Sequence, residues 1–252
     1  MFCLRKLLIV IAFIPALAAQ TAEELVERNL KAKGGVDKIK AIQTLRLSGK
    51  MQQGSFTAEI GRDAMAPDKV RQTFTVLGMT AIQAYDGTTG WKISPFEGRK
   101  DPELLGEEEL RSIIEEADFY GPLVDYRAKG NTIEYLGHGT VDGDDAFRLK
   151  VTLKNGDIYY YYLDPETFLE VRVERIQFVG GAVREIFSEP GSYKLVSGVY
   201  FPFSLETGSK QNPGEPTKIT LEKMEANVPL DSKEFQMPSV PSGPSSGKEF
   251  DR

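Results

Sequence analysis

Apolar and polar side chains alternate with a period of two along most of this chain. Leu45, Leu47 and Met51 alternate with polar residues, and the same pattern recurs in residues 56–93 and again after Asn131. Successive side chains of a strand point to opposite faces of a sheet, so this period predicts strands with one buried face. Glycine, proline and aspartate stand at the breaks. We therefore predict about ten or eleven antiparallel strands rather than a parallel α/β sheet.

Residues 131–178 carry aromatic side chains on both faces of a predicted strand. Turns are expected at Asp142-Gly143-Asp144-Asp145 and at Asn155-Gly156, and the strand after the second turn contains four consecutive tyrosines. Alternation places Tyr159, Tyr161 and Leu163 on one face and Tyr160 and Tyr162 on the other. We expect the first set to face the interior. We expect one tyrosine pair to be partly exposed, because no segment is predicted to cover the outer face.

Two segments follow the period of a helix instead. Residues 21–41 begin with Thr21, which can cap a helix, and Glu24 completes a capping-box pattern before Gly34 and Gly35 interrupt the segment. Residues 102–126 have glutamates on one side and apolar residues three and four positions apart on the other: Leu105, Leu110, Ile113, Ile114 and Ala117. Each helix is amphipathic and must lie on an apolar surface.

Together these elements predict a mainly β (α+β) fold in one domain, residues 20–238. The simplest arrangement is a strongly curved antiparallel sheet with two helices covering its concave face. Because each helix has one apolar stripe, the helices need not fill the concavity, and an apolar cavity can remain beneath them. The candidate positions for lining such a cavity are Leu47, Phe74, Val76, Trp91, Leu110, Ile113, Ile114, Tyr159, Tyr161 and Leu163.

The two ends of the chain differ from this domain. Residues 1–19 have a basic start at Arg5 and Lys6, a short apolar run and small residues at a predicted cleavage site, which is typical of a cleavable signal peptide. Cys3 precedes the apolar run, so we expect a soluble exported protein rather than a lipid-anchored one. Residues 239–252 are rich in proline, serine and glycine and are expected to be a disordered tail.

Charge and composition exclude several kinds of chemistry. The formal charge of -6 becomes about -8 once Arg5 and Lys6 are removed, and this acidic balance argues against a nucleic-acid partner. The single histidine, His138, stands between glycines, and the only cysteine lies in the predicted signal peptide. We therefore expect no catalytic residues, no metal site and no cofactor. A carboxylate pair for glycoside hydrolysis stays an alternative, because only its spatial separation can test it.

Several motifs occur in a recognisable order. An opening helix at residues 22–35 leads into a strand at residues 45–51, and a second helix is inserted at residues 107–118. The shorter motifs are Tyr85-Asp86-Gly87, Gly90-Trp91, Leu163-Asp164-Pro165-Glu166-Thr167, Gly198-Val199-Tyr200-Phe201-Pro202 and Asn227-Val228-Pro229 with Phe235. In these features the chain resembles the lipoprotein-localisation superfamily of the carrier LolA and its receptor LolB, and in particular outer-membrane lipoprotein-sorting proteins.

This resemblance implies an unclosed β-barrel with helices as a lid over an apolar cavity. It also implies a non-enzymatic periplasmic carrier or chaperone that binds acyl chains of lipoproteins or other lipids in transit to the outer membrane. Inner- and outer-membrane transport components are the implied protein partners, and a monomer is expected. The family's carrier has an arginine that latches its lid. Arg46 lies in an early strand, as that arginine does, although its neighbours differ.

Two other functions remain open at this stage. The same sheet, fully packed, would suit an interaction module or an envelope-stress sensor that binds a partner protein at a sheet edge or at the proline-rich tail. A hydrolase of envelope material would need two buried carboxylates that converge in a cleft.

Overall fold

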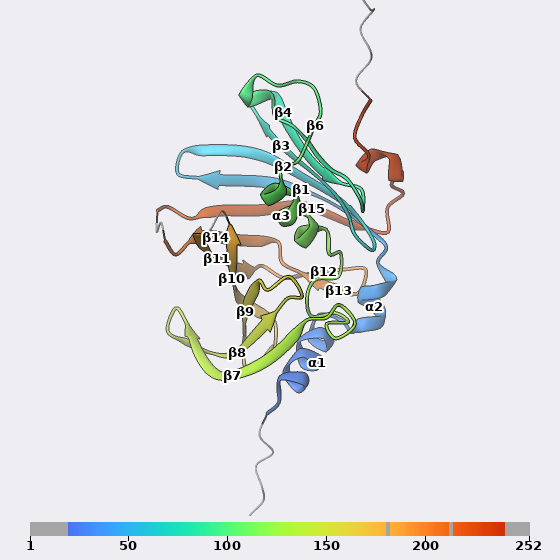
Figure 1. Ribbon diagram of the computed structural model, residues 1–252. Helices are drawn as coiled ribbons and strands as arrows, with labels where there is room; N and C mark the ends of the chain where they lie inside the picture. The colour runs from blue at the N-terminus through green and yellow to red at the C-terminus, as the bar shows by residue number, and fades with distance from the viewer. Residues whose placement is uncertain (1–19, 180–181, 212–213, 240–252) are drawn as a thin grey trace, which may run out of the picture.

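The computed structural model describes residues 20–179, 182–211 and 214–239 (Figure 1). The predicted signal peptide, residues 1–19, lies outside these ranges, and so does the predicted tail, residues 239–252, apart from Ser239.

Antiparallel strands make up most of the described chain, with three short α-helices and two 3₁₀ turns. The helical elements are α1 (Ala22–Ala32), α2 (Val36–Ala41), α3 (Glu107–Ala117), η1 (Pro95–Glu97) and η2 (Ser232–Phe235). The strands are β1 (Thr44–Gln53), β2 (Phe56–Met65), β3 (Lys69–Val76), β4 (Met79–Tyr85), β5 (Gly90–Ile93), β6 (Glu103–Leu104), β7 (Thr132–Val141), β8 (Asp144–Thr152), β9 (Ile158–Leu163), β10 (Glu170–Val179), β11 (Ala182–Gly191), β12 (Lys194–Val196), β13 (Val199–Phe201), β14 (Ser204–Ser209) and β15 (Thr217–Ala226).

Thirteen of these strands form one antiparallel sheet in the order β6-β5-β4-β3-β2-β1-β15-β14-β11-β10-β9-β8-β7, and β12 pairs with β13 separately. The sheet coils strongly, but its edge strands β6 and β7 do not meet (Figure 1). The first and last long strands, β1 and β15, pair at its middle. At Gly49 of β1 a Cβ atom would lie 2.2 Å from the Thr220 carbonyl oxygen, so only glycine allows this close pairing.

Helix α1 covers the concave face of the β7–β10 half. Its start has the predicted capping box between Thr21 and Glu24. Its apolar stripe, which includes Leu25, lies in one core cluster with side chains such as Leu149 of β8. Its buried Asn29 donates through Nδ2 to the Phe168 carbonyl at 2.8 Å. An apolar stripe and one buried amide therefore fix α1 to the sheet.

Helix α3 covers the concave face of the other half. Ile113 and Ala117 are buried against Val70 of β3 and Tyr85 of β4. The helix is shorter than the predicted segment 102–126, because Asp118 has an extended conformation that ends it. The predicted fold class is confirmed: a curved, unclosed antiparallel sheet carries helices on its concave face.

The convex face has a cover that the sequence did not lead us to expect. Trp91 of β5 is only 2% exposed, and its Nε1 donates to the Phe235 carbonyl of η2 at 2.7 Å. Phe235 itself is fully buried. The C-terminal 3₁₀ turn therefore packs on the outer side of the β3–β5 region, where it shields the tryptophan.

The four consecutive tyrosines divide between the two faces as alternation requires. Tyr159 and Tyr161 pack with the core beneath α1, and Tyr160 and Tyr162 pack in a small cluster on the other face. The expected difference in exposure is wrong, because each face has one buried and one half-buried tyrosine. The reason is Arg148, whose guanidinium carbon lies 4.5 Å and 5.6 Å from the ring centroids of Tyr160 and Tyr162.

Candidate functional site

A cleft of about 560 Å³ opens on the concave face beside α3. Its volume lies within the range of about 300–1,000 Å³ that is usual for small-molecule sites. Its floor consists of apolar side chains from β1, β2, β3, β4, β14 and β15: Leu47, Met51, Ile60, Phe74, Ala81, Leu205, Ile219 and Leu221. Arg62, Gln72, Gln83, Lys92, Glu109 and Glu116 line the same space. The cleft is therefore a wide apolar surface with a polar margin.

Strand register arranges this margin as a row. Arg62 pairs with Gln72, Gln72 with Gln83, and Gln83 with Lys92, so four polar residues cross β2, β3, β4 and β5 at one level. We call these four residues the polar row. The next residues on the same face, two positions along each strand, form a second, apolar level across the sheet. This level contains Ile60, Phe74 and Ala81. The two levels are about 7 Å apart.

The polar row holds α3 in place. Arg62 Nη2 donates to the Glu116 backbone carbonyl of α3 at 2.5 Å. Gln72 Nε2 donates to the Glu116 carboxylate, and Lys92 Nζ donates to Glu109 Oε1 at 2.7 Å. Burial of its guanidinium lowers the pKa of Arg62, and the negative charge of Glu116 opposes that effect.

Arg46, the arginine of an early strand, does not contact α3. Arg46 lies on the opposite face from this cleft floor, where it forms two hydrogen bonds with Asp63, at 2.7 Å and 3.1 Å. Arg62 on the neighbouring strand reaches the helix instead. The sequence contained a signal for this, because Ala58, Ile60 and Arg62 share one face, so the arginine follows two apolar positions into the concavity.

A second polar cluster joins α3 to β9 and β10. The Glu115 carboxylate accepts hydrogen bonds from the Tyr159 hydroxyl at 3.0 Å, the Asn155 amide at 2.9 Å and the Gln177 amide at 3.3 Å. Burial raises the pKa of Glu115 to about 7, and the neighbouring carboxylate of Asp157 adds to this rise. Asp157 is fully buried and accepts a hydrogen bond from Arg111. The two carboxylates thus converge under the helix, held by structural hydrogen bonds.

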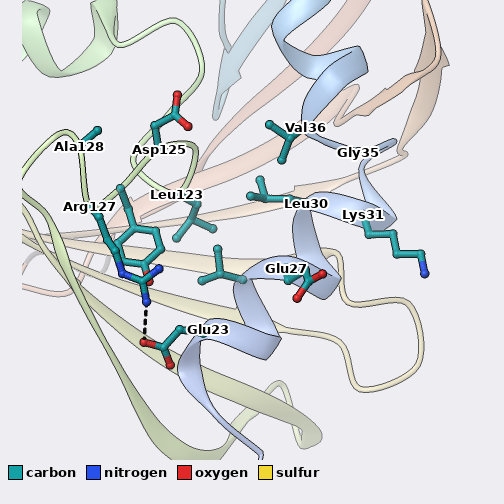
Figure 2. A pocket seen from close by; sticks show the side chains of 12 residues that line it. Glu23, Glu27, Leu30, Lys31, Gly35, Val36, Leu123, Asp125, Arg127 and Ala128 are labelled. Carbon is teal, nitrogen blue, oxygen red and sulfur yellow. Dashed lines mark hydrogen bonds and ion pairs between the residues drawn. The ribbon is translucent and has the colours of Figure 1, made fainter.

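Two further hollows border α1. One, of about 260 Å³, lies between α1, α2 and residues 118–124 and includes Tyr161. The other, of about 650 Å³, is an open groove between α1 and residues 123–128, and an ion pair from Glu23 to Arg127 lies at its rim (Figure 2). Its apolar lining residues Leu30 and Leu123 are already buried in the core. The groove therefore has less free apolar surface than its size indicates, and we regard the cleft beside α3 as the candidate site.

The structure distributes the predicted lining residues over several environments. Leu47 and Phe74 line the cleft, and Val76 lies on the same face as Phe74, one level further out. Leu110 and Ile113 fill the seam between α3 and the sheet. The three members from β9 lie elsewhere on the concave side: Tyr159 touches α3, Tyr161 borders the small hollow, and Leu163 is buried in the core beneath α1.

Two of these predictions are wrong. Trp91 is on the convex face, because Lys92, its neighbour in the strand, points to α3 on the concave face. Ile114 is 44% exposed, because the apolar face of α3 that meets the sheet is centred on Ile113 and Ala117. The candidate residues that sequence reasoning missed are the four members of the polar row, which interrupt the apolar face of their strands.

The described residues contain neither a metal-binding cluster nor a membrane-spanning helix. No group of three or more histidine, cysteine, aspartate or glutamate side chains there could hold a metal ion. None of the helices in the described ranges combines the length and the apolar character needed to cross a membrane.

Comparison with solved structures identifies the architecture. A LolA superfamily protein from Nitrosomonas europaea matches with a TM-score of 0.59 at 14% identity, over 86% of this chain and 98% of the other. A DUF1329 family protein from Desulfovibrio piger matches with a TM-score of 0.60 at 13% identity, over 85% and 97%. An outer membrane lipoprotein-sorting protein domain from Vibrio parahaemolyticus matches with a TM-score of 0.57 at 14% identity, over 83% and 97%.

The sequence itself gives no such match. No protein-family model matches the chain, and no curated protein matches it either. At identities of 13–14% the solved structures show the fold alone. The chain therefore has the fold of LolA superfamily proteins.

Proposed function

We propose that this protein is a periplasmic carrier that shelters an acyl chain of a lipoprotein or another lipid in the cleft beside α3. The observation that carries the proposal is the apolar floor of the cleft, which extends over six strands. The cleft itself has a volume of about 560 Å³. A surface of this kind, on the half of the sheet that α3 covers, suits a flexible hydrocarbon chain better than a rigid polar ligand.

Apolar burial supplies the affinity in this proposal. Each methylene group transferred from water into the cleft contributes about 0.8 kcal/mol, so a chain of about ten methylenes binds without directed polar contacts. Part of that free energy is lost in ordering the chain and the side chains around it. The proposed ligand is held by its hydrocarbon portion.

Helix α3 acts as the lid in this proposal. It is fastened by Arg62 at the polar row and by Tyr159 on β9, while its apolar stripe packs on Val70 and Tyr85. Loading and release of a chain require these hydrogen bonds to break and the helix to tilt. The solved lipoprotein-sorting domain of the same fold supports this carrier role. Export by residues 1–19 and exchange with inner- and outer-membrane components belong to the same proposal.

The alternatives have less support from the contacts described above. A packed interaction or sensor module has no use for a cleft with an unfilled apolar floor. A hydrolase needs carboxylates that are free to act on a substrate, yet Glu109 in the cleft is bound by Lys92 and Glu116 by Gln72. The carrier is therefore the function that the geometry supports best.

The test is to purify the protein from the periplasm of an expressing cell and analyse it by native mass spectrometry. We expect a co-purifying lipid, and displacement of a fluorescent fatty acid by added lipid. A Phe74→Asp variant places a charge on the cleft floor and should abolish both signals, whereas Leu195→Asp, on an exposed position outside the cleft, should keep them. Absence of lipid together with failure to bind the fluorescent probe would overturn the carrier proposal.

A further inference from the structure

The cleft is apolar at one level and polar at the next. The polar row lies at the level where α3 crosses the sheet, because Arg62, Gln72 and Lys92 all bond to that helix. Beyond it, Ile60 and Phe74 begin the apolar floor, which extends along the strands toward the β1–β2 and β3–β4 turns. A ligand that lies along the strands thus has its polar end fixed at the row and its apolar end over the floor.

Arg62 has hydrogen-bonding capacity left for a ligand. A guanidinium has five N–H donors. Within the described part of the chain, Arg62 makes one hydrogen bond, from Nη2 to the Glu116 carbonyl. The carboxylate of Glu116 is the acidic group that acts on Arg62, and it accepts from Gln72. Arg62 therefore brings a half-buried positive charge to the cleft without a carboxylate hydrogen-bonded to it.

Gln83 adds a second donor at the same level. It lies between Gln72 and Lys92 in the row, and its side-chain amide makes no hydrogen bond within the described residues. Its amide nitrogen can donate to an oxygen atom in the cleft. Lys92 contributes positive charge next to it, although its ammonium is bound by Glu109.

We propose that the cleft takes a single-chain amphiphile with a carboxylate head group, a long-chain fatty acid or a molecule of that chemistry. The carboxylate binds Arg62 and Gln83, and the hydrocarbon chain lies over Ile60 and Phe74. This inference rests on the proposed carrier function and adds the chemistry of the head group. A guanidinium and a carboxylate match in geometry and charge, which makes arginine the suitable residue at this position.

The alternative head groups fit less well. A neutral head group gives Arg62 no opposite charge beyond that of Glu116, whose carboxylate is hydrogen-bonded to Gln72. A cationic head group would have to displace Lys92 from Glu109 or Gln72 from Glu116 and would lie beside Arg62. A carboxylate is favoured over both.

The experiment compares three ligands with the same chain and different charge: dodecanoate, dodecanol and dodecylammonium. Binding to the purified full chain is measured by isothermal titration calorimetry at pH 7.5. We expect dodecanoate to bind about tenfold more tightly than dodecanol, the effect of one charge-assisted hydrogen bond, and dodecylammonium to bind most weakly. In Arg62→Gln the ratio of the dodecanoate affinity to the dodecanol affinity should fall to within about twofold; a loosened α3 changes both affinities together and leaves this ratio as the readout.

Two further variants separate recognition of the head group from a loosened lid. Gln83→Leu touches no hydrogen bond to α3 and should weaken dodecanoate by about threefold without weakening dodecanol. Arg46→Gln removes an arginine one strand away on the opposite face and should leave all three affinities unchanged.

Each outcome decides between the two proposals. Equal binding of dodecanoate and dodecanol by the unmodified protein overturns the carboxylate inference and leaves the carrier function standing. Preference for dodecylammonium overturns it as well, and would assign the head group to Glu109 and Glu116. If none of the three ligands binds, the carrier function fails and this inference fails with it.

Discussion

The Tyr159 hydroxyl of β9 donates a hydrogen bond to the Glu115 carboxylate of α3 across 3.0 Å. This contact joins α3 to the half of the sheet that its apolar stripe does not touch, since Ile113 and Ala117 pack on β3 and β4. The helix thus bridges the two halves of the concave face, with apolar contacts on one side and hydrogen bonds on the other.

Protonation of Glu115 is expected to make stability depend on pH. Its pKa is about 7 in the folded protein and 4.5 ordinarily, so between these values the folded state binds more protons than the unfolded state. The contribution of Glu115 to stability should therefore be full below pH 4.5 and decline as the pH rises through 7. Because Glu115 is partly exposed, we expect a loss of about 1 kcal/mol, or roughly 2–4 °C in Tm.

Thermal unfolding of Glu115→Gln between pH 4.5 and 8 checks this expectation. The amide mimics the protonated acid, so the variant should lose this component of the decline and match or exceed the unmodified protein at pH 8. Glu108→Gln, on an exposed position of the same helix, is the control and should retain the slope. An unchanged slope in Glu115→Gln would contradict the assignment.

Adjacent isoleucines of α3 are expected to differ sharply in their contribution to stability. Ile113 is 1% exposed against Val70 and Tyr85, so Ile113→Ala leaves a cavity and should lower the free energy of unfolding by about 2–4 kcal/mol. Ile114→Ala, at a position that is 44% exposed, should change it by less than about 0.5 kcal/mol. Urea unfolding measures both, and equal effects would show that α3 is not seated as described.

The C-terminal turn η2 is expected to protect the only tryptophan of the chain. Phe235→Ala removes a fully buried ring beside Trp91 and should destabilise the protein by about 3–4 kcal/mol. It should also move the tryptophan emission to longer wavelength in the folded protein. Leu195→Ala, at an exposed position, should do neither. An unshifted emission spectrum for Phe235→Ala would mean that Trp91 is shielded by something other than η2.

An ion pair between half-buried Lys33 and buried Glu170 gives a prediction with the opposite pH dependence. Burial acts to raise the pKa of Glu170, but the charge of Lys33, together with hydrogen bonds from Lys33 and Tyr193, lowers it overall. The pair therefore stabilises the fold above the ordinary pKa of the acid, and this stabilisation is lost as the pH falls through the folded value.

Lys33→Met should cost about 2–4 kcal/mol at pH 8 and distinctly less at pH 4, where Glu170 takes up a proton more readily in the variant. Chemical unfolding at the two pH values measures the difference. Lys40→Met breaks an exposed pair with Asp125 and should cost less than about 1 kcal/mol at either pH. A cost for Lys33→Met that does not change with pH would rule out the ion pair as its source.

Local patterns predicted the elements of this fold well, because each depends on residues close in sequence. The capping box of Thr21 and Glu24 begins α1, and the alternation of residues 158–163 divides the tyrosines between the two faces. Contacts between segments that are far apart in the chain could not be predicted from local patterns. The burial of Trp91 against η2 leaves no local signal, and for Arg62 the alternation indicates the face of the sheet but not its partner Glu116, since each contact joins segments far apart in the chain.

The candidate site shows the same limit. Leu47 and Phe74 could be assigned to the cleft because the apolar residues on one face of a strand all point to the same side of the sheet. The polar row could not, because its four members come from four strands and align only through the register of three strand pairs. Ile114 was wrongly assigned to the cavity because the helical period shows which residues form the apolar stripe of α3 but not which of them face the sheet directly.

The pairing of β1 with β15 at the middle of the sheet has a consequence for the order of assembly. Leu45 faces Ala226 across this pair, so the two central strands come from opposite ends of the domain. Strands β1 to β6, and likewise β7 to β11, can form neighbouring hairpins as the chain emerges, but within the sheet the two halves are joined through β14 and β15. Closure of so long a loop is slow relative to local pairing. A polypeptide that is still incomplete therefore has two half-sheets with open edges, and the cleft floor exists only after the last strand is in place.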